Sequence, residues 1–331
     1  FSLNLEVRRG VMIPQLILGW NFPHYEFYNC SSVHPPGEWW RTIFGKQDYL
    51  FGAWSIAYGI LIELIYIPCI IVLFPERRNT CYAIMLTLGF IDMLSIACNS
   101  IMFGFFMLEG AVFCSRPLLI WITGALALGA WCAGCMACFL LITNRIFELL
   151  NWQSHRTARP WIFQLVIFIY FCFFALFTPP VLASSTHRAM FFDPFIDMHW
   201  DNFYVNWLHT VNNFLIVLLS ALLYAVFCAA LRFRQSSMST DVSNAVVTAN
   251  RSIFMQASII CGLDVIASLI YVYMNFFDSP PELRQIGQVA WQLSHGAPPV
   301  IYLTLNRTIR NGVKKLFTLP NKVKTSGGPI P

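Results

Sequence analysis

The stretch Phe51–Phe74, FGAWSIAYGILIELIYIPCIIVLF, decides the fold class of this chain of 331 residues. A helix of about 20 mainly apolar residues crosses the hydrocarbon core of a bilayer, and this stretch exceeds that length with one charged residue, Glu63. Because the apolar runs of the chain are continuous and do not alternate with polar residues, they predict helices and not the strands of a β-barrel. The expected fold is an all-α bundle of seven membrane-spanning helices. Six further stretches of this kind follow the first, at Cys81–Met107, Pro117–Glu148, Trp161–Ala183, Trp207–Leu231, Ser252–Met274 and Ile286–Leu305.

The composition also points to a membrane protein. Apolar residues make up 57% of the chain and charged residues 11%, against roughly 45–50% and about 25% in soluble domains. These values exclude a soluble globule and a disordered chain. The links between spans are too short for a second domain, so we expect an N-terminal segment at 1–50, the bundle at 51–305 and a tail at 306–331. No signal peptide is expected, because Val11–Trp20 is short and interrupted by Pro14.

The positions of the basic residues predict the orientation. Fourteen of the 21 Lys and Arg residues lie in the links after the first, third and fifth spans or in the tail, and basic residues favour the cytoplasmic side. The N-terminus is therefore expected outside and the C-terminus inside, and no nucleic-acid partner is needed to explain the net charge of +5. The sequon at Asn29 is then a glycosylation candidate on the outside. After the last span we expect a short amphipathic helix on the inner membrane surface, with an apolar face of Ile309, Val313, Leu316 and Phe317.

Four ionisable residues fall near the middle of the predicted spans, where a charge is costly. Glu63, Asp92, Asp264 and His295 lie at similar depths in four different spans, and Asn99 shares a helix face with Asp92. We expect these five residues to form one buried polar layer. Two interpretations stay open: a hydrated switch that holds a proton or a cation in one helix arrangement, and a fixed hydrogen-bonded cluster with neutral carboxyl groups.

Nine of the 11 cysteines lie in or beside apolar runs and are expected to be packing residues. The series Cys132, Cys135 and Cys138 has no His or acidic partner nearby, so no metal site is expected. Cys30 and Cys114 lie in segments that the orientation places outside, in an oxidising compartment, and we predict that they form a disulfide. The alternative is that Cys30 stays unpaired or modified.

Enzyme motifs are missing from the sequence. We find no Gly-x-Ser-x-Gly, no His-Glu-x-x-His and no phosphate-binding loop. No lysine lies within a span, which excludes a retinal Schiff base. The chain is therefore expected to be neither an enzyme nor a cofactor-binding protein.

Several dispersed motifs, in the order of a known family, carry a resemblance. Together they make the chain similar to the nematode serpentine receptors of class T, a chemoreceptor family of the G-protein-coupled receptors. The similarity extends from about Gly45 to Phe317. The motifs are Gly59-Ile60 with Glu63, Tyr66, Ile67 and Pro68; Asn79-Thr80-Cys81-Tyr82; Leu88-Gly89-Phe90-Ile91-Asp92-Met93; Gly110-Ala111-Val112-Phe113-Cys114; Asn144-Arg145 with Glu148-Leu149; and His295-Gly296 with Pro299 and Tyr302.

The resemblance implies a receptor that couples to a heterotrimeric G protein. Arg145 resembles the arginine of the Asp-Arg-Tyr motif of the large receptor class, and Asp92 resembles its second-span aspartate. Pro299 and Tyr302 resemble the Pro-x-x-Tyr end of its seventh span. Asn144 departs from the pattern, because it replaces the acidic neighbour that would pair with the arginine in the resting state. We therefore expect the resting lock to be different or weaker.

The resemblance also implies a pocket for a small ligand in the outer half of the bundle. The cue is expected to be apolar or amphipathic because the aromatic candidates at that height are Trp121, Trp207, Tyr271, Tyr273 and Trp291. Each of these aromatics also suits an interfacial belt. The expected location is the plasma membrane of sensory cells.

Three alternatives remain open at this stage. A proton- or cation-linked transporter is motivated by the carboxyl groups in the spans, although no internal repeat is visible. A ligand-gated channel of the seven-helix type would need its N-terminus inside. A seven-helix protein that no longer signals is kept open by Asn144.

Overall fold

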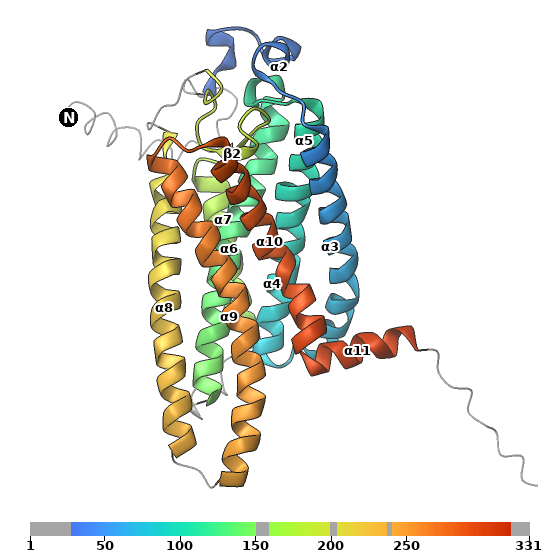
Figure 1. Cartoon of the computed structure of the whole chain (residues 1–331), viewed down its shortest axis with the longest axis vertical. Helices are drawn as coiled ribbons and strands as arrows, with labels where there is room; N and C mark the ends of the chain where they lie inside the picture. Colours follow the sequence, from blue (N-terminus) through green and yellow to red (C-terminus); the bar gives the residue numbers. More distant parts are fainter. Residues whose placement is uncertain (1–27, 150–158, 199–203, 237–239, 319–331) are drawn as a thin grey trace, which may run out of the picture.

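The computed structural model describes residues 28–149, 159–198, 204–236 and 240–318 (Figure 1). The described part is mainly helical, with one two-stranded antiparallel sheet. Its elements in chain order are η2 (Cys30–Ser32), α2 (Glu38–Phe44), α3 (Tyr49–Glu76), α4 (Thr80–Ile96), η3 (Ala97–Met102), α5 (Phe103–Glu109), η4 (Phe113–Ser115), α6 (Pro117–Leu149), α7 (Pro160–Phe177), β1 (Leu182–Ser184), β2 (Ala189–Phe191), α8 (Trp207–Ser236), α9 (Thr240–Phe276), α10 (Pro281–Leu305) and α11 (Arg307–Phe317).

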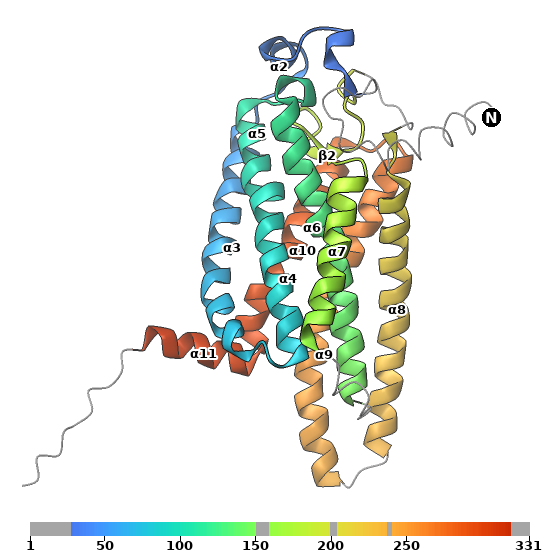
Figure 2. The same cartoon turned by 180° about the vertical axis from the view of Figure 1, so that it is seen from behind.

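Seven long helical segments lie side by side and form the predicted bundle, in which α4, η3 and α5 together make the second segment (Figures 1 and 2). The prediction of an all-α, seven-helix fold is thereby confirmed. Helix α6 packs against α4, α7, α8 and α9 and is the most buried of the apolar spans. Among the described residues, six helices are long and apolar enough to cross a membrane. Helix α10 is the seventh and is more polar, because its buried face carries glutamines and a histidine.

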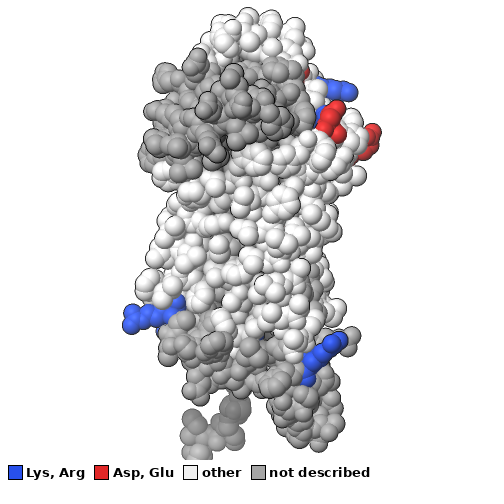
Figure 3. All heavy atoms as spheres, turned by 90° about the vertical axis from the view of Figure 1, so that its left-hand side faces the viewer, with Lys and Arg blue, Asp and Glu red and all other residues white. Residues whose placement is uncertain are grey.

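The two ends of the bundle differ. One end carries α2 and the β1–β2 hairpin, and we call it the hairpin end. The other end carries the α3–α4 link and α11, which projects sideways past α3, and we call it the α11 end (Figures 1 and 2). On the face seen in Figure 3, the described Lys, Arg, Asp and Glu side chains lie toward the ends, and a belt of uncharged described residues lies between them.

Two predicted spans have different limits in the structure. The stretch Trp161–Ala183 was expected to be helical throughout, but α7 ends at Phe177 and Ala183 belongs to β1. Pro179 and Pro180 cause this end, because proline lacks the backbone N–H that a helix needs. The polar link Arg232–Arg251 is largely helical, since α8 continues to Ser236 and α9 begins at Thr240. That link contains neither Gly nor Pro, the residues that end helices most strongly.

The second span contains a π-helix, η3, between α4 and α5. A π segment widens the helix and is common at functional sites. Here the carbonyl oxygen of Asn99 accepts hydrogen bonds from the side-chain amides of Gln288 and Gln292, each at 2.9 Å. The wide turn thus binds α10 to the second segment.

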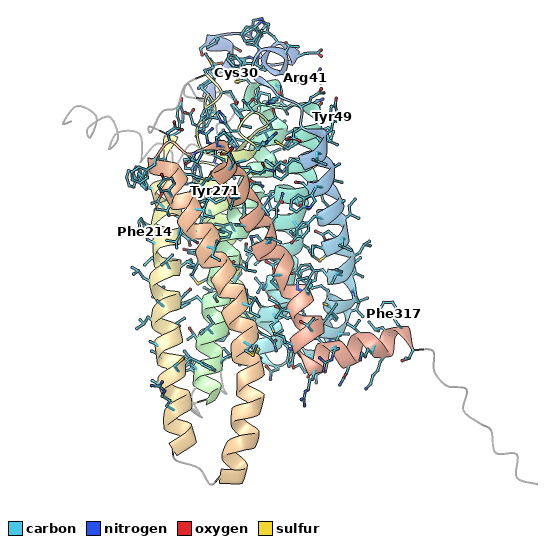
Figure 4. The ribbon with its side chains drawn as sticks, in the orientation of Figure 1. Cys30, Arg41, Tyr49, Phe214, Tyr271 and Phe317 are labelled. Atoms are coloured by element: carbon cyan, nitrogen blue, oxygen red, sulfur yellow. A yellow bond between two sulfur atoms is a disulfide. The ribbon has the colours of Figure 1, made fainter. Side chains whose placement is uncertain are left out.

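The amphipathic helix after the last span is present as α11. Asn306 caps it, because its side-chain oxygen accepts hydrogen bonds from the N–H groups of Thr308 and Ile309. The apolar face divides into two parts. Ile309 and Val313 are buried against the bundle, whereas Leu316 and Phe317 are exposed, as Figure 4 shows for Phe317 at the far end of the helix. The exposed part suits the membrane surface.

Candidate functional site

A small cavity lined by buried side chains lies in the bundle on the hairpin side of its middle. Trp131 comes from α6, His209 from α8, Tyr271 from α9 and Trp291 from α10. In Figure 4 Tyr271 lies in the part of α9 that is nearer the hairpin end. The volume that the centre of a water molecule can occupy is ≈ 10 Å³, which is room for about one water. The lining residues are Leu128, Trp131, Val181, His209, Tyr271 and Trp291.

Aromatic rings and amides hold the walls of this cavity in place. The ring centroids of Trp131 and Trp291 are 6.2 Å apart, and those of Tyr271 and Trp291 are 5.6 Å apart, both in edge-to-face contact. The indole N–H of Trp131 donates to Oδ1 of Asn213 at 2.9 Å. The hydroxyl of Tyr271 donates to Oε1 of Gln288 at 3.0 Å. A ligand larger than one water therefore has to move at least one of these rings.

The structure separates the five aromatic pocket candidates. Tyr271 and Trp291 line the cavity, but the other three lie elsewhere. Trp121 contacts Tyr28 near the hairpin end, with ring centroids 4.8 Å apart. Trp207 and Tyr273 are largely exposed on the outside of the bundle. The faces of α8 and α9 that carry Trp207 and Tyr273 point out of the bundle. Hydropathy alone does not reveal the direction in which a helix face points.

Four lining residues, Leu128, Trp131, Val181 and His209, are absent from the sequence-based candidates. His209 begins a polar group on α8 that also contains Thr210, Asn212 and Asn213, all of them buried. Such a buried polar group at the start of an apolar span was the signal available in the sequence. Trp131 gave no comparable signal, since it lies among apolar neighbours.

Below the cavity, towards the α11 end, three buried side chains form a hydrogen-bonded cluster. Nδ1 of His295 lies 2.7 Å from Oδ1 of Asp92. The hydroxyl of Tyr66 donates to Oδ2 of Asp92 at 2.6 Å and to the carbonyl oxygen of His295 at 3.2 Å. All three side chains are almost completely buried. This Tyr66–Asp92–His295 cluster joins α3, α4 and α10.

The structure brings part of the expected polar layer together. Asp92 and His295 are in direct contact. Asn99 is buried seven residues further along the second segment, nearer the hairpin end, where its side chain bonds Ser95. Asp264 is buried, but it lines a different small cavity between α6, α8 and α9 with Cys138 and Cys261. Glu63 is half-buried on α3, and its Oε1 has no hydrogen-bond partner among the described residues. The expected layer is thus a hydrogen-bonded pair, Asp92 and His295, and the other carboxyl groups, of Glu63 and Asp264, do not join that pair through hydrogen bonds.

The cavity and the cluster are in contact through Trp131. The ring centroids of Trp131 and His295 are 5.8 Å apart in an edge-to-face arrangement. His295 also packs on Gly134, one helical turn after Trp131: a Cβ added to Gly134 would lie 3.2 Å from Cε1 of the His295 ring. A shift of Trp131 therefore acts directly on the imidazole that bonds Asp92.

The residues proposed for coupling lie at the α11 end. Asn144 is buried and Arg145 is half-buried near the end of α6. Tyr302 of α10 is buried, and its hydroxyl has no hydrogen-bond partner among the residues that the structure describes. The carbonyl oxygen of Pro299 lies 4.0 Å from Sγ of Cys69 on α3. Part of the positive charge counted for this side, Arg156, Lys322 and Lys324, lies outside the described residues.

At the hairpin end a disulfide joins Cys30 and Cys114, the pair that the sequence predicts. Asn29, the glycosylation candidate, is exposed and caps the short helix that contains Cys30. The β1–β2 hairpin is held by backbone contact as well, since the N–H of Ser185 donates to the carbonyl oxygen of Ala111 at 3.0 Å. The disulfide ties the N-terminal segment, and the Ser185 bond ties the link between α7 and α8, to the segment between α5 and α6.

Two partly buried ionisable groups of the α7–α8 link, His187 and Asp197, lie close together. Burial raises the pKa of Asp197 to about 6, although Ser184 donates a hydrogen bond to its carboxyl group. Burial and the nearby Arg284 lower the pKa of His187. Nε2 of His187 lies 3.6 Å from Oδ1 of Asp197. Within the described ranges no three His, Cys, Asp or Glu residues are grouped closely enough to hold a metal ion.

The chain is similar to known proteins of one family. The chain matches the model of the family described as "Serpentine type 7TM GPCR chemoreceptor Srt" over residues 15–326. The chain belongs to the Srt family. It is also similar to "Serpentine receptor class T-55" of Caenorhabditis elegans, with 27% identity over 306 residues, which cover 90% of this chain and 82% of that protein.

Membership of the Srt family makes this chain a multi-pass membrane protein of a chemoreceptor family and not of an enzyme class. The seven-helix bundle and its apolar belt agree with that membership. Within this Srt chain, the cavity lined by Trp131 and the Tyr66–Asp92–His295 cluster beneath it form one connected arrangement in the bundle.

Proposed function

We propose that this Srt protein is a chemosensory receptor that binds a small apolar or amphipathic molecule in the cavity lined by Trp131 and signals through a heterotrimeric G protein at its α11 end. The observation that carries the proposal is the position of Trp131. This residue lines the cavity and contacts both Trp291 and His295. A ligand that enlarges the cavity displaces these rings, and His295 transmits the displacement to Asp92 and Tyr66 on two other helices. A ligand shifts the equilibrium between two helix arrangements in this way when it binds one of them better.

The direction of signalling in this proposal is from the hairpin end outside to the α11 end inside. The disulfide between Cys30 and Cys114 supports it, because disulfides form in oxidising compartments. The basic residues of the α11 end support it as well, by the positive-inside rule. They include Arg77, Arg307, Arg310, Lys314 and Lys315. The expected location is the plasma membrane of sensory cells.

The proposed contact with the G protein includes Arg145. Helices α8 and α9 extend beyond the other helices at the α11 end (Figure 1), and Arg145 lies near the end of α6, which packs against both of them. Asn144 supplies no carboxylate, so the charged lock of the Asp-Arg-Tyr motif is absent from this position of the sequence. We therefore expect a measurable basal signal without ligand.

The test compares two arginines near opposite ends of α6. Arg145→Ala removes the proposed coupling residue, and Arg116→Ala removes an exposed arginine directly before α6 at the hairpin end. G-protein activation is measured in cells at equal surface expression, without ligand and with a panel of volatile and water-soluble compounds. We expect the basal signal and any response to be lost with Arg145→Ala and retained with Arg116→Ala. Equal signals from the two variants, or no signal from the unsubstituted protein at normal surface expression, would contradict the proposal.

A further inference from the structure

A second and larger cavity lies between α3 and α10 at the hairpin end. Its volume is ≈ 470 Å³, within the range of about 300–1,000 Å³ that holds small-molecule ligands. It shares no lining residue with the smaller cavity that Trp131 lines. We call it the α3–α10 cleft, defined by Asp48, Leu50, Phe51, Trp54, Arg188, Gln285 and Val289.

One part of the α3–α10 cleft is polar. The guanidinium group of Arg188, in the turn between β1 and β2, lies 2.7 Å from Oδ2 of Asp48 and also approaches Oε1 of Gln285. Arg188 is the one described residue other than glycine with a positive φ, 56°, a conformation that is unfavourable for a residue with a Cβ. The bonds to Asp48 and Gln285 hold the arginine in this position across the two helices.

The other part of the cleft is apolar and aromatic. Phe51 and Trp54 stack with ring centroids 5.9 Å apart, and Trp54 stacks on Tyr58 at 5.5 Å. Val289 forms the opposite wall on α10. Leu50 is 86% exposed and Trp54 is 40% exposed, on the outer side of α3 whose first residue, Tyr49, is labelled in Figure 4. The cleft therefore opens sideways, toward the surrounding bilayer, and not into the centre of the bundle.

The charge balance decides which head group fits. Arg188 and Asp48 neutralise each other, so an anionic head would be repelled by Asp48 and a cationic head by Arg188. A hydroxyl or amide group avoids both costs, because its oxygen accepts from the guanidinium group while its hydrogen is donated to the carboxylate. We infer that the α3–α10 cleft binds an uncharged amphiphile from the bilayer, with a hydroxyl- or amide-bearing head at Arg188 and Asp48 and a single alkyl chain along Phe51, Trp54 and Val289.

The first experiment measures binding alone, so it does not depend on signalling. The full chain in phosphatidylcholine nanodiscs is labelled with a monoacylglycerol that carries a photoreactive group in its alkyl chain, and the labelled peptides are identified by mass spectrometry. We expect labels within 48–58 and 285–292, and competition by unlabelled monoacylglycerol. Val289→Trp fills the cleft and should lower this labelling at least fivefold. Val300→Trp is the matched control, because Val300 is 43% exposed on the same helix outside the cleft and its replacement should leave the labelling unchanged.

A second variant tests the head group and does not depend on how Val289→Trp folds. Asp48→Asn keeps a residue type that caps helices well, so α3 retains its capped start, but it leaves the positive charge of Arg188 unbalanced. The unsubstituted chain should prefer the monoacylglycerol over a fatty-acid probe of the same chain at least threefold, and Asp48→Asn should reverse that preference. Labels spread evenly over lipid-facing residues, labelling unaffected by Val289→Trp, or an unchanged preference in Asp48→Asn would each overturn the inference.

Discussion

The substitution Tyr66→Phe tests the cluster that joins α3, α4 and α10. It removes one hydroxyl group from a side chain that is completely buried, and with it the bonds to Oδ2 of Asp92 at 2.6 Å and to the carbonyl oxygen of His295 at 3.2 Å. A hydrogen bond to a charged group contributes about 1.5–3 kcal/mol in soluble proteins, whereas bonds between membrane helices average about 0.6 and reach about 1.7 kcal/mol. Because the single hydroxyl hydrogen is shared between these two acceptors, we expect a loss of about 1–2 kcal/mol in unfolding free energy.

The loss should lower Tm by about 2–8 °C, given a shift of about 2–4 °C per kcal/mol in domains of 150–250 residues. The assay is thermal unfolding of the purified protein in detergent, followed with a dye that becomes fluorescent on reaction with thiols. The chain provides the reporters, since Cys69 and Cys81 are completely buried and become reactive on unfolding.

Tyr82→Phe is the matched control for this prediction. Tyr82 lies in the first turn of α4, and its hydroxyl makes no hydrogen bond to the described residues, so its Tm should change by less than about 1 °C. A double-mutant cycle of Tyr66→Phe with Asp92→Asn should give a coupling energy of about 1 kcal/mol. If Tyr66→Phe behaves like Tyr82→Phe, or if the cycle shows no coupling, the cluster does not hold the three helices together.

Three more predictions concern single contacts. Gly134→Ala should destabilise the protein by about 1–3 kcal/mol because the new Cβ presses on His295. Gly262→Ala is the control and should not destabilise it, because nothing lies within 4 Å of the added Cβ. Calorimetry that ranks the two variants the other way would refute this packing. The pKa of Asp197 is raised to about 6 from 3.8, so the folded protein holds this proton more tightly than the unfolded chain does. Tm should therefore rise as the pH falls through about 6 towards 3.8, and the Asp197→Asn variant should lose this dependence. An equal pH response in both proteins would contradict the prediction. Replacing Cys30 and Cys114 by Ser opens a loop with a sequence separation of 84. Chain entropy predicts that this lowers the unfolding free energy by at most about 4–5 kcal/mol. A reductant should lower the Tm of the unsubstituted protein to that of the variant and leave the Tm of the variant unchanged.

The sequence predicted several parts of the candidate site. The mid-span positions of Asp92 and His295 placed them at similar depth, because helix rise converts residue number into depth, and the structure brings them into contact. The same argument placed Glu63 and Asp264 at that depth, but depth says nothing about the direction in which a side chain points. Asp264 therefore lies on a different cavity, and Glu63 lies apart from the Asp92–His295 pair.

Other parts of the site were outside the reach of sequence reasoning. The hydroxyl of Tyr66 meets Asp92 across 26 positions of sequence, and an apolar span offers no pattern that predicts such a bond. Gln288 and Gln292 are buried because the π-helix η3 presents the carbonyl oxygen of Asn99 to them. Their spacing of four, with His295 three residues later, was the available signal of a polar helix face.

The sequence by itself determined how many membrane-spanning helical segments this protein has and where most of them begin and end. A bilayer imposes a minimum apolar length on every span, and charged links and prolines mark the boundaries. Only the tertiary structure decided how each helix is rotated about its axis. Lipid is as apolar as the core of the bundle, so a Leu, Phe or Trp side chain is equally suited to either side, and the composition of a span does not tell one face from the other. For this reason Trp131 and Trp291 face the cavity while Trp207 faces outward, and helix packing alone distinguishes them.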